Sequence, residues 1–160
     1  MANNLKAIIL LATAGLLPPA LLWFLDKKNM KQQQPIVTVD KQQKNLTAFL
    51  MMLQYAEGTY GINAYRTLYG GALYNDFSRH PNLSIRKSGI TSTAAGAYQF
   101  LYKTWTELQQ QLGLPDFSPF SQDRAAVELI RRKGALEDIR AGRFSVAINK
   151  CRKTWASLPG

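Results

Sequence analysis

The chain has 160 residues, 46% of them hydrophobic, which is enough for one domain with a packed core and a small additional segment. Its formal net charge of +10 favours binding to anionic polymers or anionic surfaces. One cysteine, Cys151, excludes an internal disulfide, and one histidine, His80, leaves no Cys/His metal pattern, so no metal or cofactor is predicted. A Ser-His-Asp or Cys-His mechanism would need His80, whose turn-like setting in "SRHPN" does not favour that use.

Residues 1–28 are predicted to anchor the protein in a membrane. Within them, residues 7–25 read "AIILLATAGLLPPALLWFL", a run of 19 residues without a charge. A helix needs about 20 apolar residues to span a bilayer. Trp23 and Phe24 lie near the end of the run, where interfacial aromatic residues are typical. Lysines on both sides of the run leave its orientation open.

A cleaved signal peptide and a buried core helix are the alternatives for this segment. An A-x-A pattern at residues 12–14 is typical of a cleavage site, but the apolar run continues for eleven residues beyond it. Two adjacent prolines and the polar sequence that follows disfavour a core helix. An uncleaved anchor is therefore preferred.

Residues 29–44, "NMKQQQPIVTVDKQQK", are rich in glutamine and lysine and are predicted to form a polar tether. The domain that follows is predicted at residues 45–160. Its first helix is indicated by apolar residues at helical spacing: Leu46, Phe49, Leu50 and Leu53. Asn45 is a plausible N-cap for this helix, and Gly58 is placed to end it.

Residues 58–91 differ from the sequence before them, being rich in tyrosine and glycine. Gly70-Gly71 in "LYGGALY" is a hairpin signal. We therefore expect a small β-rich insertion between the first helix and the rest of the domain.

Four helical segments are predicted after this insertion. One starts at Ser92 or Thr93 and ends at Gly113, one starts at Ser118-Pro119 and ends at Gly134, one occupies residues 136–141, and the last carries Phe144, Ile148, Cys151 and Trp155 on one face. The pattern predicts an α+β fold, mostly helical and two-lobed, with Glu57 at the hinge of a groove between the lobes.

Glu57 is the main catalytic candidate. It ends an apolar helical pattern, so its carboxylate would lie at the negative end of a helix dipole and against an apolar face. Both effects favour the protonated form and raise the pKa of Glu57. A glutamic acid that is protonated near neutral pH is what a glycosidase uses as its general acid. The alternative is a solvated glutamate at a frayed helix end.

The sequence around Glu57 favours a sugar-binding groove. Five tyrosines within twenty residues offer apolar faces and hydroxyls to sugar rings: Tyr55, Tyr60, Tyr65, Tyr69 and Tyr74. In "TAAGAYQF", Tyr98 and Gln99 are predicted in the first turns of a helix, and the Ala-Ala-Gly sequence allows close backbone approach. Ordinary burial in strands and in the core is the alternative for these residues.

Six collinear sequences lie between residues 46 and 160: "FLMMLQYAEGTYG", "YGGALYNDFSRHP", "STAAGAYQF", "QLGLPDFSPFSQDRAAVELI", "KGALEDI" and "WASLPG". Together they resemble the lambda-type phage endolysins. The resemblance implies a lysozyme-like fold and cleavage of the β-1,4 bond between N-acetylmuramic acid and N-acetylglucosamine in peptidoglycan. It implies lytic transglycosylation, with the glutamate of "EGT", Glu57, as acid and base. The anchor and tether are additional to the soluble family type, and the family sequence continues beyond "SLPG".

The resemblance also implies roles in a glycan cleft for Tyr98 and Gln99. The full set of predicted substrate-binding residues is Tyr98, Gln99, Tyr65, Ser92 and Thr93. Hydrolysis is the alternative chemistry, with Asp76 positioning a water molecule or stabilising the oxocarbenium-like state. Alternatively, Asp76 has no catalytic role and only forms the turn in "YNDFSRHP".

Peptidoglycan strands are the predicted partner, together with a membrane through residues 7–25. Nine basic residues would form a cationic face near wall carboxylates, or only a solvated helix face: Arg124, Arg131, Arg132, Lys133, Arg140, Arg143, Lys150, Arg152 and Lys153. No nucleic acid is expected, because no DNA- or RNA-reading motif is present. A non-catalytic, membrane-tethered wall-binding protein is the alternative from another class. The predicted location is the host inner membrane, with the catalytic domain in the periplasm. Association of the protein with a virion is the alternative.

Overall fold

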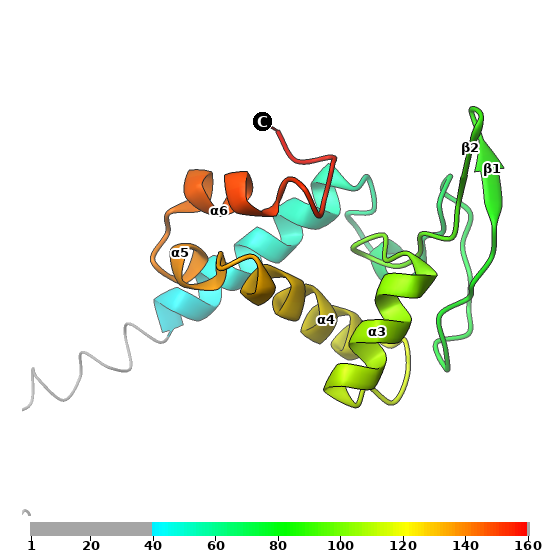
Figure 1. The fold of residues 1–160 in the computed structure, drawn as a ribbon, viewed down its shortest axis with the longest axis horizontal. Helices are drawn as coiled ribbons and strands as arrows, with labels where there is room; N and C mark the ends of the chain where they lie inside the picture. The colour runs from blue at the N-terminus through cyan, green and yellow to red at the C-terminus, as the bar shows by residue number, and fades with distance from the viewer. Residues whose placement is uncertain (1–39, 160) are drawn as a thin grey trace, which may run out of the picture. The chain divides into compact units, whose positions relative to one another are not determined.

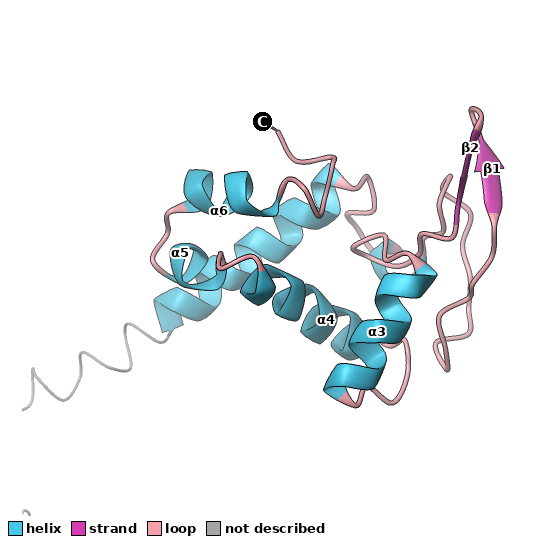
Figure 2. Cartoon of the chain, in the orientation of Figure 1, coloured by secondary structure: helices cyan, strands magenta, loops and turns pink. Residues whose placement is uncertain are grey.

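The computed structural model describes residues 40–159, and its first helix occupies residues 40–56 (Figures 1 and 2). Leu46, Phe49 and Leu53 are buried along one face of this helix, as their spacing predicts. The helix begins earlier than predicted because the lysines and glutamines before Asn45 are good helix formers. Asn45 is therefore not an N-cap; its side-chain amide donates to the carbonyl oxygen of Arg140 at 2.9 Å.

The predicted anchor, residues 1–28, and residues 29–39 of the predicted tether lie outside the described residues. Residues 40–44, assigned to the tether from sequence, belong to the first helix instead. Within residues 40–159, no helix is both long enough and apolar enough to cross a membrane.

The segment after the first helix forms turns and a short hairpin. A 3-10 helix, η1, spans Ala64–Arg66, and the Gly70-Gly71 turn is closed by a 2.7 Å bond from Leu68 N to Ala72 O. Strands β1 (Ile85–Lys87) and β2 (Ile90–Ser92) pair antiparallel. Ser88 and Gly89 connect them with φ angles of 50° and 81°, the positive values that a type I′ hairpin turn requires. The predicted β-rich insertion is confirmed, although its hairpin turn is Ser88-Gly89.

The helix predicted from Ser92 or Thr93 is wrong over its first part. Helix α3 spans Tyr102–Leu112, and the preceding residues form turns held by isolated bridges from Ala95 to Leu68 and to Phe100. The Thr93 side chain still satisfies a free N–H at the start of α3, because its Oγ1 accepts a hydrogen bond from Tyr102 N at 3.1 Å.

The last three helices follow their sequence signals closely. They are α4 (Pro119–Arg132), α5 (Leu136–Arg140) and α6 (Phe144–Cys151). Ser118 caps α4 through its side chain, with Pro119 in the first turn, as predicted. Trp155 lies beyond α6 but is buried, so only its place in the helix was predicted wrongly.

The helices share one core, and the hairpin projects from one end of it (Figure 1). The largest buried apolar side chains come from the first helix, α3, α4 and α5 and from the turns between: Trp105, Tyr98, Phe49, Phe117, Leu53, Leu108, Ile130 and Ile139. The smaller buried side chains of Ala147 and Cys151 complete the core under α6. From Gln42 onward the chain is one compact unit, so the two predicted lobes are parts of a single domain.

Candidate active site

Glu57 is positioned by the turn that ends the first helix. Gly58 has φ +69°, and its N–H donates to Tyr55 O at 3.0 Å, while Thr59 N donates to Gln54 O at 2.9 Å. This pair of bonds is a Schellman turn with glycine at C′, which makes Glu57 the C-cap residue. The backbone thus fixes where the carboxyl group leaves the helix.

Burial raises the pKa of Glu57, and a hydrogen bond from the Ser157 hydroxyl opposes that rise only in part. The predicted direction of the shift is confirmed, with desolvation as its main cause. The carboxyl group therefore retains its proton to higher pH than an exposed glutamate does.

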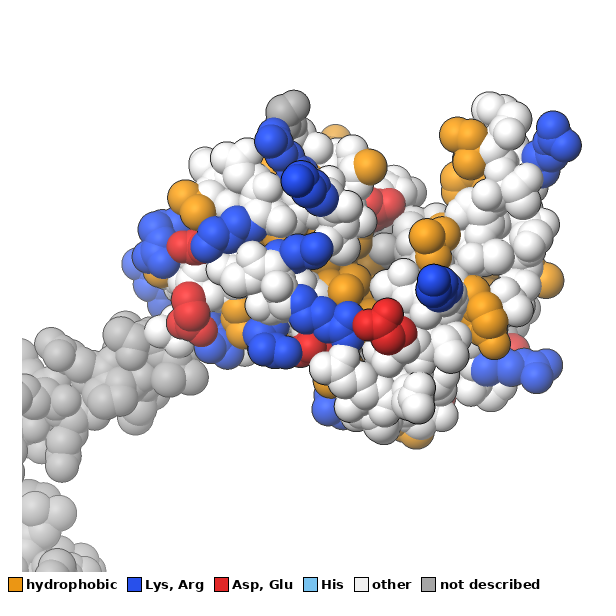
Figure 3. Space-filling view, viewed as in Figure 1, with side chains coloured by type: hydrophobic (Ala, Val, Ile, Leu, Met, Phe, Trp, Pro, Cys, Tyr) orange, Lys and Arg blue, Asp and Glu red, His pale blue; other side chains and the backbone are white. Residues whose placement is uncertain are grey.

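Glu57 lies where two pockets meet. One pocket, about 210 Å³, is lined by Glu57, Tyr98, Gln99, Phe100, Leu101, Thr104, Leu129, Thr154, Trp155, Ala156 and Ser157. The other, about 350 Å³, is lined by Glu57, Gly58, Thr59, Thr67, Leu68, Tyr69, Gly70, Gly71, Lys87 and Gln99. We call these two pockets together the Glu57 cleft. Figure 3 shows the surface hollowed between the hairpin and the helical part of the molecule.

Gln99 lines both halves of the Glu57 cleft beside Glu57. Its φ of 48° lies in the left-handed region, which is uncommon for a residue with a side chain. Two bonds from its side-chain amide hold it there, to Gly96 O at 3.0 Å and to Thr67 O at 3.1 Å. The structure therefore brings Gln99 to the carboxyl group, by a turn and not by the predicted helix.

The turn that carries Gln99 is hydrogen-bonded both to the segment that follows the first helix and to α4. Thr59 Oγ1 donates to Ala97 O at 2.7 Å, which connects the turn to the end of the first helix. Ala97 N donates to Oε1 of buried Gln122 at 2.9 Å. Gly96, at φ +79°, passes so close to Gln122 that a Cβ there would lie 2.2 Å from Oε1. The close backbone approach predicted from Ala-Ala-Gly is confirmed.

Tyr98 belongs mainly to a buried hydrogen-bond network. Its hydroxyl donates to Asp123 Oδ1 at 2.6 Å, and the Tyr65 hydroxyl donates to the same atom at 2.9 Å. The Gln54 side-chain amide reaches both tyrosine oxygens at 3.4 Å. Burial and the neighbouring Asp123 raise the pKa of both tyrosines, so they remain neutral donors. Gln54 precedes Glu57 by one helical turn, and the network therefore orients the helix end.

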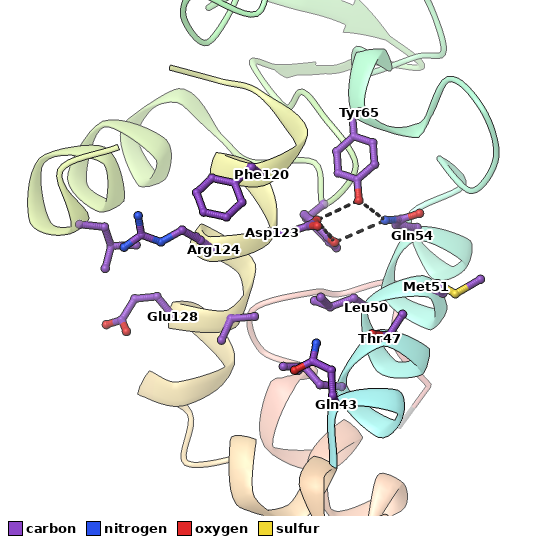
Figure 4. Close-up of a pocket in the computed structure, with 14 residues that line it drawn as sticks. Gln43, Thr47, Leu50, Met51, Gln54, Tyr65, Phe120, Asp123, Arg124 and Glu128 are labelled. Atoms are coloured by element: carbon purple, nitrogen blue, oxygen red, sulfur yellow. Dashed lines mark hydrogen bonds between the residues drawn. The ribbon is translucent and has the colours of Figure 1, made fainter. Parts of the chain in front are cut away.

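A separate pocket of about 450 Å³ lies over this network, between the first helix and α4 (Figure 4). Tyr65, Asp123 and Gln54 converge on one another at its wall, and Leu50, Met51 and Val127 make other parts of it apolar. Glu57 does not line it. This pocket is larger than either half of the Glu57 cleft, but the glutamate whose pKa burial raises lies outside it, so we place the chemistry at Glu57.

Other predicted site residues lie elsewhere. Asp76 is exposed and accepts from Ser78 N at 2.8 Å, which is the turn-forming arrangement, and hydrogen bonds from Ser78 keep its pKa low. Ser92 accepts from Ala94 N at 3.1 Å. Asp76, Ser92, Thr93 and Tyr65 line neither half of the Glu57 cleft.

His80 and Cys151 are buried structural residues. His80 Nδ1 accepts from Asn82 N at 3.1 Å and Nε2 faces Phe100 O at 2.8 Å, so the proton lies on Nε2. Burial lowers the pKa of His80 and raises that of Cys151 to about 11. Neither residue lines the Glu57 cleft, in agreement with the sequence analysis.

Sequence reasoning missed several residues of the cleft. They are Ser157 from the C-terminal segment, Thr104 from α3 and Lys87 from β1, which line the cleft together with Glu57. Only tertiary packing brings them together, although the Ser88-Gly89 pair beside Lys87 was a usable hairpin signal.

Many of the basic residues in 124–153 are already paired with acidic side chains. Five of them take part in ion pairs with Glu107, Glu128, Glu137 or Asp138: Arg131, Arg132, Arg140, Arg143 and Lys150. The carboxylates of Glu128 and Asp138 are buried, and each pairs with two of these cations. The pairs reduce the positive charge that this surface can offer to a polyanion.

Comparison with known proteins identifies the family of this chain. The endolysin family matches residues 47–160. The endolysin of Escherichia phage P2 is 47% identical over 133 residues, covering 73% of this chain and 81% of the P2 protein. The endolysin of Escherichia phage lambda is 42% identical over 132 residues, covering 78% of this chain and 82% of the lambda protein.

Solved structures extend the similarity to three dimensions. Bacteriophage lambda lysozyme complexed with a chitohexasaccharide has a TM-score of 0.70 at 42% identity, covering 72% of this chain and 80% of that one. A second structure of lysozyme from bacteriophage lambda has a TM-score of 0.69 at 41% identity, with the same coverage. The predicted lysozyme-like fold is therefore confirmed for the catalytic part, and the chain belongs to the endolysin family.

Proposed function

We propose that this protein degrades peptidoglycan by cleaving the β-1,4 bond between N-acetylmuramic acid and N-acetylglucosamine, with Glu57 as acid and base. The observation that carries the proposal is the position of Glu57, partly buried in a cleft with a raised pKa. The relation to lambda lysozyme, which forms a complex with a chitohexasaccharide, supports a glycan strand as the occupant of this cleft.

We favour lytic transglycosylation as the reaction. Glu57 donates its proton to the bridging oxygen, and the bond between that oxygen and C1 of the muramic acid breaks. The Glu57 carboxylate then removes the proton from the C6 hydroxyl of the same sugar, and O6 bonds to C1. The product is a 1,6-anhydro end, no water is consumed, and Glu57 is protonated again.

The absence of a second acid in the cleft supports this route. Among the described residues, Glu57 is the one acid that lines either half of the Glu57 cleft. A hydrolase of this kind uses two carboxyl groups that flank the bond. The C6 hydroxyl is already held beside C1, so its high effective concentration replaces an activated water molecule.

Mass spectrometry of the products tests the proposal. Purified sacculi digested with the protein should release muropeptides that are one water lighter than reducing ends and that resist borohydride. Reducing ends would instead favour the hydrolase. Binding to sacculi without release of any muropeptide would favour the non-catalytic wall-binding protein.

We also propose that residues 7–25 hold the protein in the host inner membrane, with the catalytic domain in the periplasm. The uncharged run of that segment supports this location. Cell fractionation tests it: the full chain should sediment with membranes and a chain lacking residues 1–28 should not. Equal distribution of the two proteins would contradict the proposal.

A further inference from the structure

Lys87 is held over the Glu57 cleft by the hairpin. It is the last residue of β1, and its partner across the hairpin is Ile90. Its Nζ donates to Gly70 O at 3.3 Å, and its Cδ lies 3.3 Å from where a Cβ on Gly70 would be. The side chain therefore folds back over the Gly70 turn, on the wall of the half-cleft that also contains Glu57.

The charge of Lys87 is not neutralised inside the cleft. Among the described residues, Lys87 is the one cation lining either half of the cleft, and no ion pair joins it to Glu57. Its ammonium group has three N–H donors, and the bond to Gly70 uses one of them. When Glu57 is protonated, the cleft therefore presents a net positive charge with donors to spare.

A neutral sugar chain gives no reason for this cation. The N-acetylated sugars of a peptidoglycan strand are uncharged, whereas the peptide stem attached to the muramic acid carries free carboxylates. The lactyl carboxyl group of the muramic acid is in amide linkage to that stem and becomes a carboxylate only where the stem is removed. A lysine ammonium group binds a carboxylate by a charge-assisted hydrogen bond. We propose that Lys87 binds a carboxylate of the muramoyl unit and makes the enzyme select carboxylate-bearing strands; this inference rests on the proposed function.

Chemical neutralisation of the substrate separates this role from a structural one. The substrates are untreated sacculi, sacculi whose carboxylates are amidated with carbodiimide and ammonia, and amidase-treated strands, which lack the stem and carry the lactyl carboxylate that its removal frees. The variants are Lys87→Gln, Lys87→Arg and Arg86→Gln. Arg86 is the matched control, because successive residues of a strand point to opposite faces.

We expect amidation of the substrate to reduce kcat/KM of the parent about tenfold, as loss of one charge-assisted bond at an exposed site predicts. Lys87→Gln should lose about the same factor on untreated sacculi and should be insensitive to amidation. Lys87→Arg keeps the positive charge and should therefore remain sensitive to amidation, and Arg86→Gln should behave like the parent. Activity on amidase-treated strands shows which position Lys87 requires: a lost Lys87 effect indicates a carboxylate of the peptide stem, and a retained one indicates that Lys87 also accepts the lactyl carboxylate freed by the amidase.

Two results would overturn the inference while leaving the proposed function intact. One is a Lys87→Gln variant that still prefers untreated sacculi by the parent's factor. The other is an equal loss in Arg86→Gln, which would indicate attraction by total charge. If the parent releases product from none of the three substrates, the proposed function is refuted, and this inference with it.

Discussion

The hydroxyl of Ser157 donates a hydrogen bond to Oε1 of Glu57, which lies 100 residues earlier in the chain. Ser157 is held in place by its neighbour Trp155, which is buried and whose Nε1 donates to Tyr98 O at 3.2 Å. Because Oε1 accepts this bond, the proton of the neutral acid lies on Oε2. The same bond stabilises the carboxylate that must take up the second proton in the proposed reaction.

Ser157→Ala tests this relationship. The hydrogen bond lowers the pKa of Glu57 against the effect of burial, so its loss should raise the pKa further. The alkaline limb of the pH–rate profile should move to higher pH, and kcat should fall about three- to tenfold because the carboxyl group is less well oriented. Ser157→Thr keeps the hydroxyl and is the control. An unchanged or lowered pKa of Glu57 in ¹³C NMR titration of Ser157→Ala would contradict this role.

Asp76→Asn separates the two reaction types. Asparagine keeps the side-chain oxygen that accepts from Ser78 N, so the turn should persist. If Asp76 is only a turn residue, activity on sacculi should stay within about twofold of the parent, as is usual for exposed positions. A loss as large as that of Glu57→Gln, with reducing ends among the products, would support the hydrolase instead.

Gly96→Ala should strongly destabilise the domain. A Cβ at Gly96 would lie 2.2 Å from Oε1 and 2.8 Å from Cδ of Gln122. Gln122 cannot move away easily, since it is fully buried and its amide donates to Phe117 O at 2.7 Å. We expect the free energy of unfolding to fall by about 3 kcal/mol or more, from overpacking added to backbone strain.

Gly71→Ala is the control for that substitution. Gly71 has φ +99° but no atom within 4 Å of an added Cβ, so only backbone strain applies. The expected loss is about 1–2 kcal/mol. Urea unfolding measures both variants, and equal losses would show that contact with Gln122 does not matter.

The stability of Glu57→Gln should depend on pH relative to the parent. The pKa of Glu57 in the folded state is raised above its ordinary value of 4.5, so the folded state binds the proton more tightly than the unfolded chain. The contribution of Glu57 to the parent's free energy of unfolding is therefore fully present below the pKa of Glu57 in the unfolded chain. It is lost as the pH rises through the pKa of Glu57 in the folded state. Glutamine cannot ionise, so the free energy of unfolding of Glu57→Gln does not have this pH-dependent loss.

Thermal unfolding at about pH 4 and about pH 8 measures this difference. The variant should gain on the parent by up to about 1 kcal/mol at the higher pH, after allowance for solvent screening. A gain at the lower pH only would mean that the pKa of Glu57 is depressed in the folded state.

The parts of the fold that the sequence predicted correctly depend on local chemistry. Ser118 before Pro119 starts α4, and Gly58 ends the first helix, because caps and left-handed turns act within a few residues. Glu57 was identified for the same reason: its place next to Gly58 is visible in the chain itself.

The parts that were missed depend on contacts between distant residues. Threonine is a residue type that often caps helices, yet no helix begins at Thr93, because Ala95 forms β-bridges with Leu68 and Phe100. Tyr65 was predicted to bind sugar, but its hydroxyl donates to Asp123 and it lines neither half of the Glu57 cleft. Tyr98 also donates to Asp123 but does line that cleft, and its contact with the glycan stays a prediction. Aspartate in the middle of a helical pattern gives no sign of such a role, so only the packed structure reveals it.

The activity of Glu57→Gln on purified sacculi tests the central claim most directly. Glutamine has nearly the shape of glutamic acid but cannot donate the proton, so the folded variant should release muropeptides about 10²- to 10⁴-fold more slowly than the parent. Release at the parent's rate, from a variant with an unchanged circular dichroism spectrum, would contradict the assignment of Glu57 as the acid.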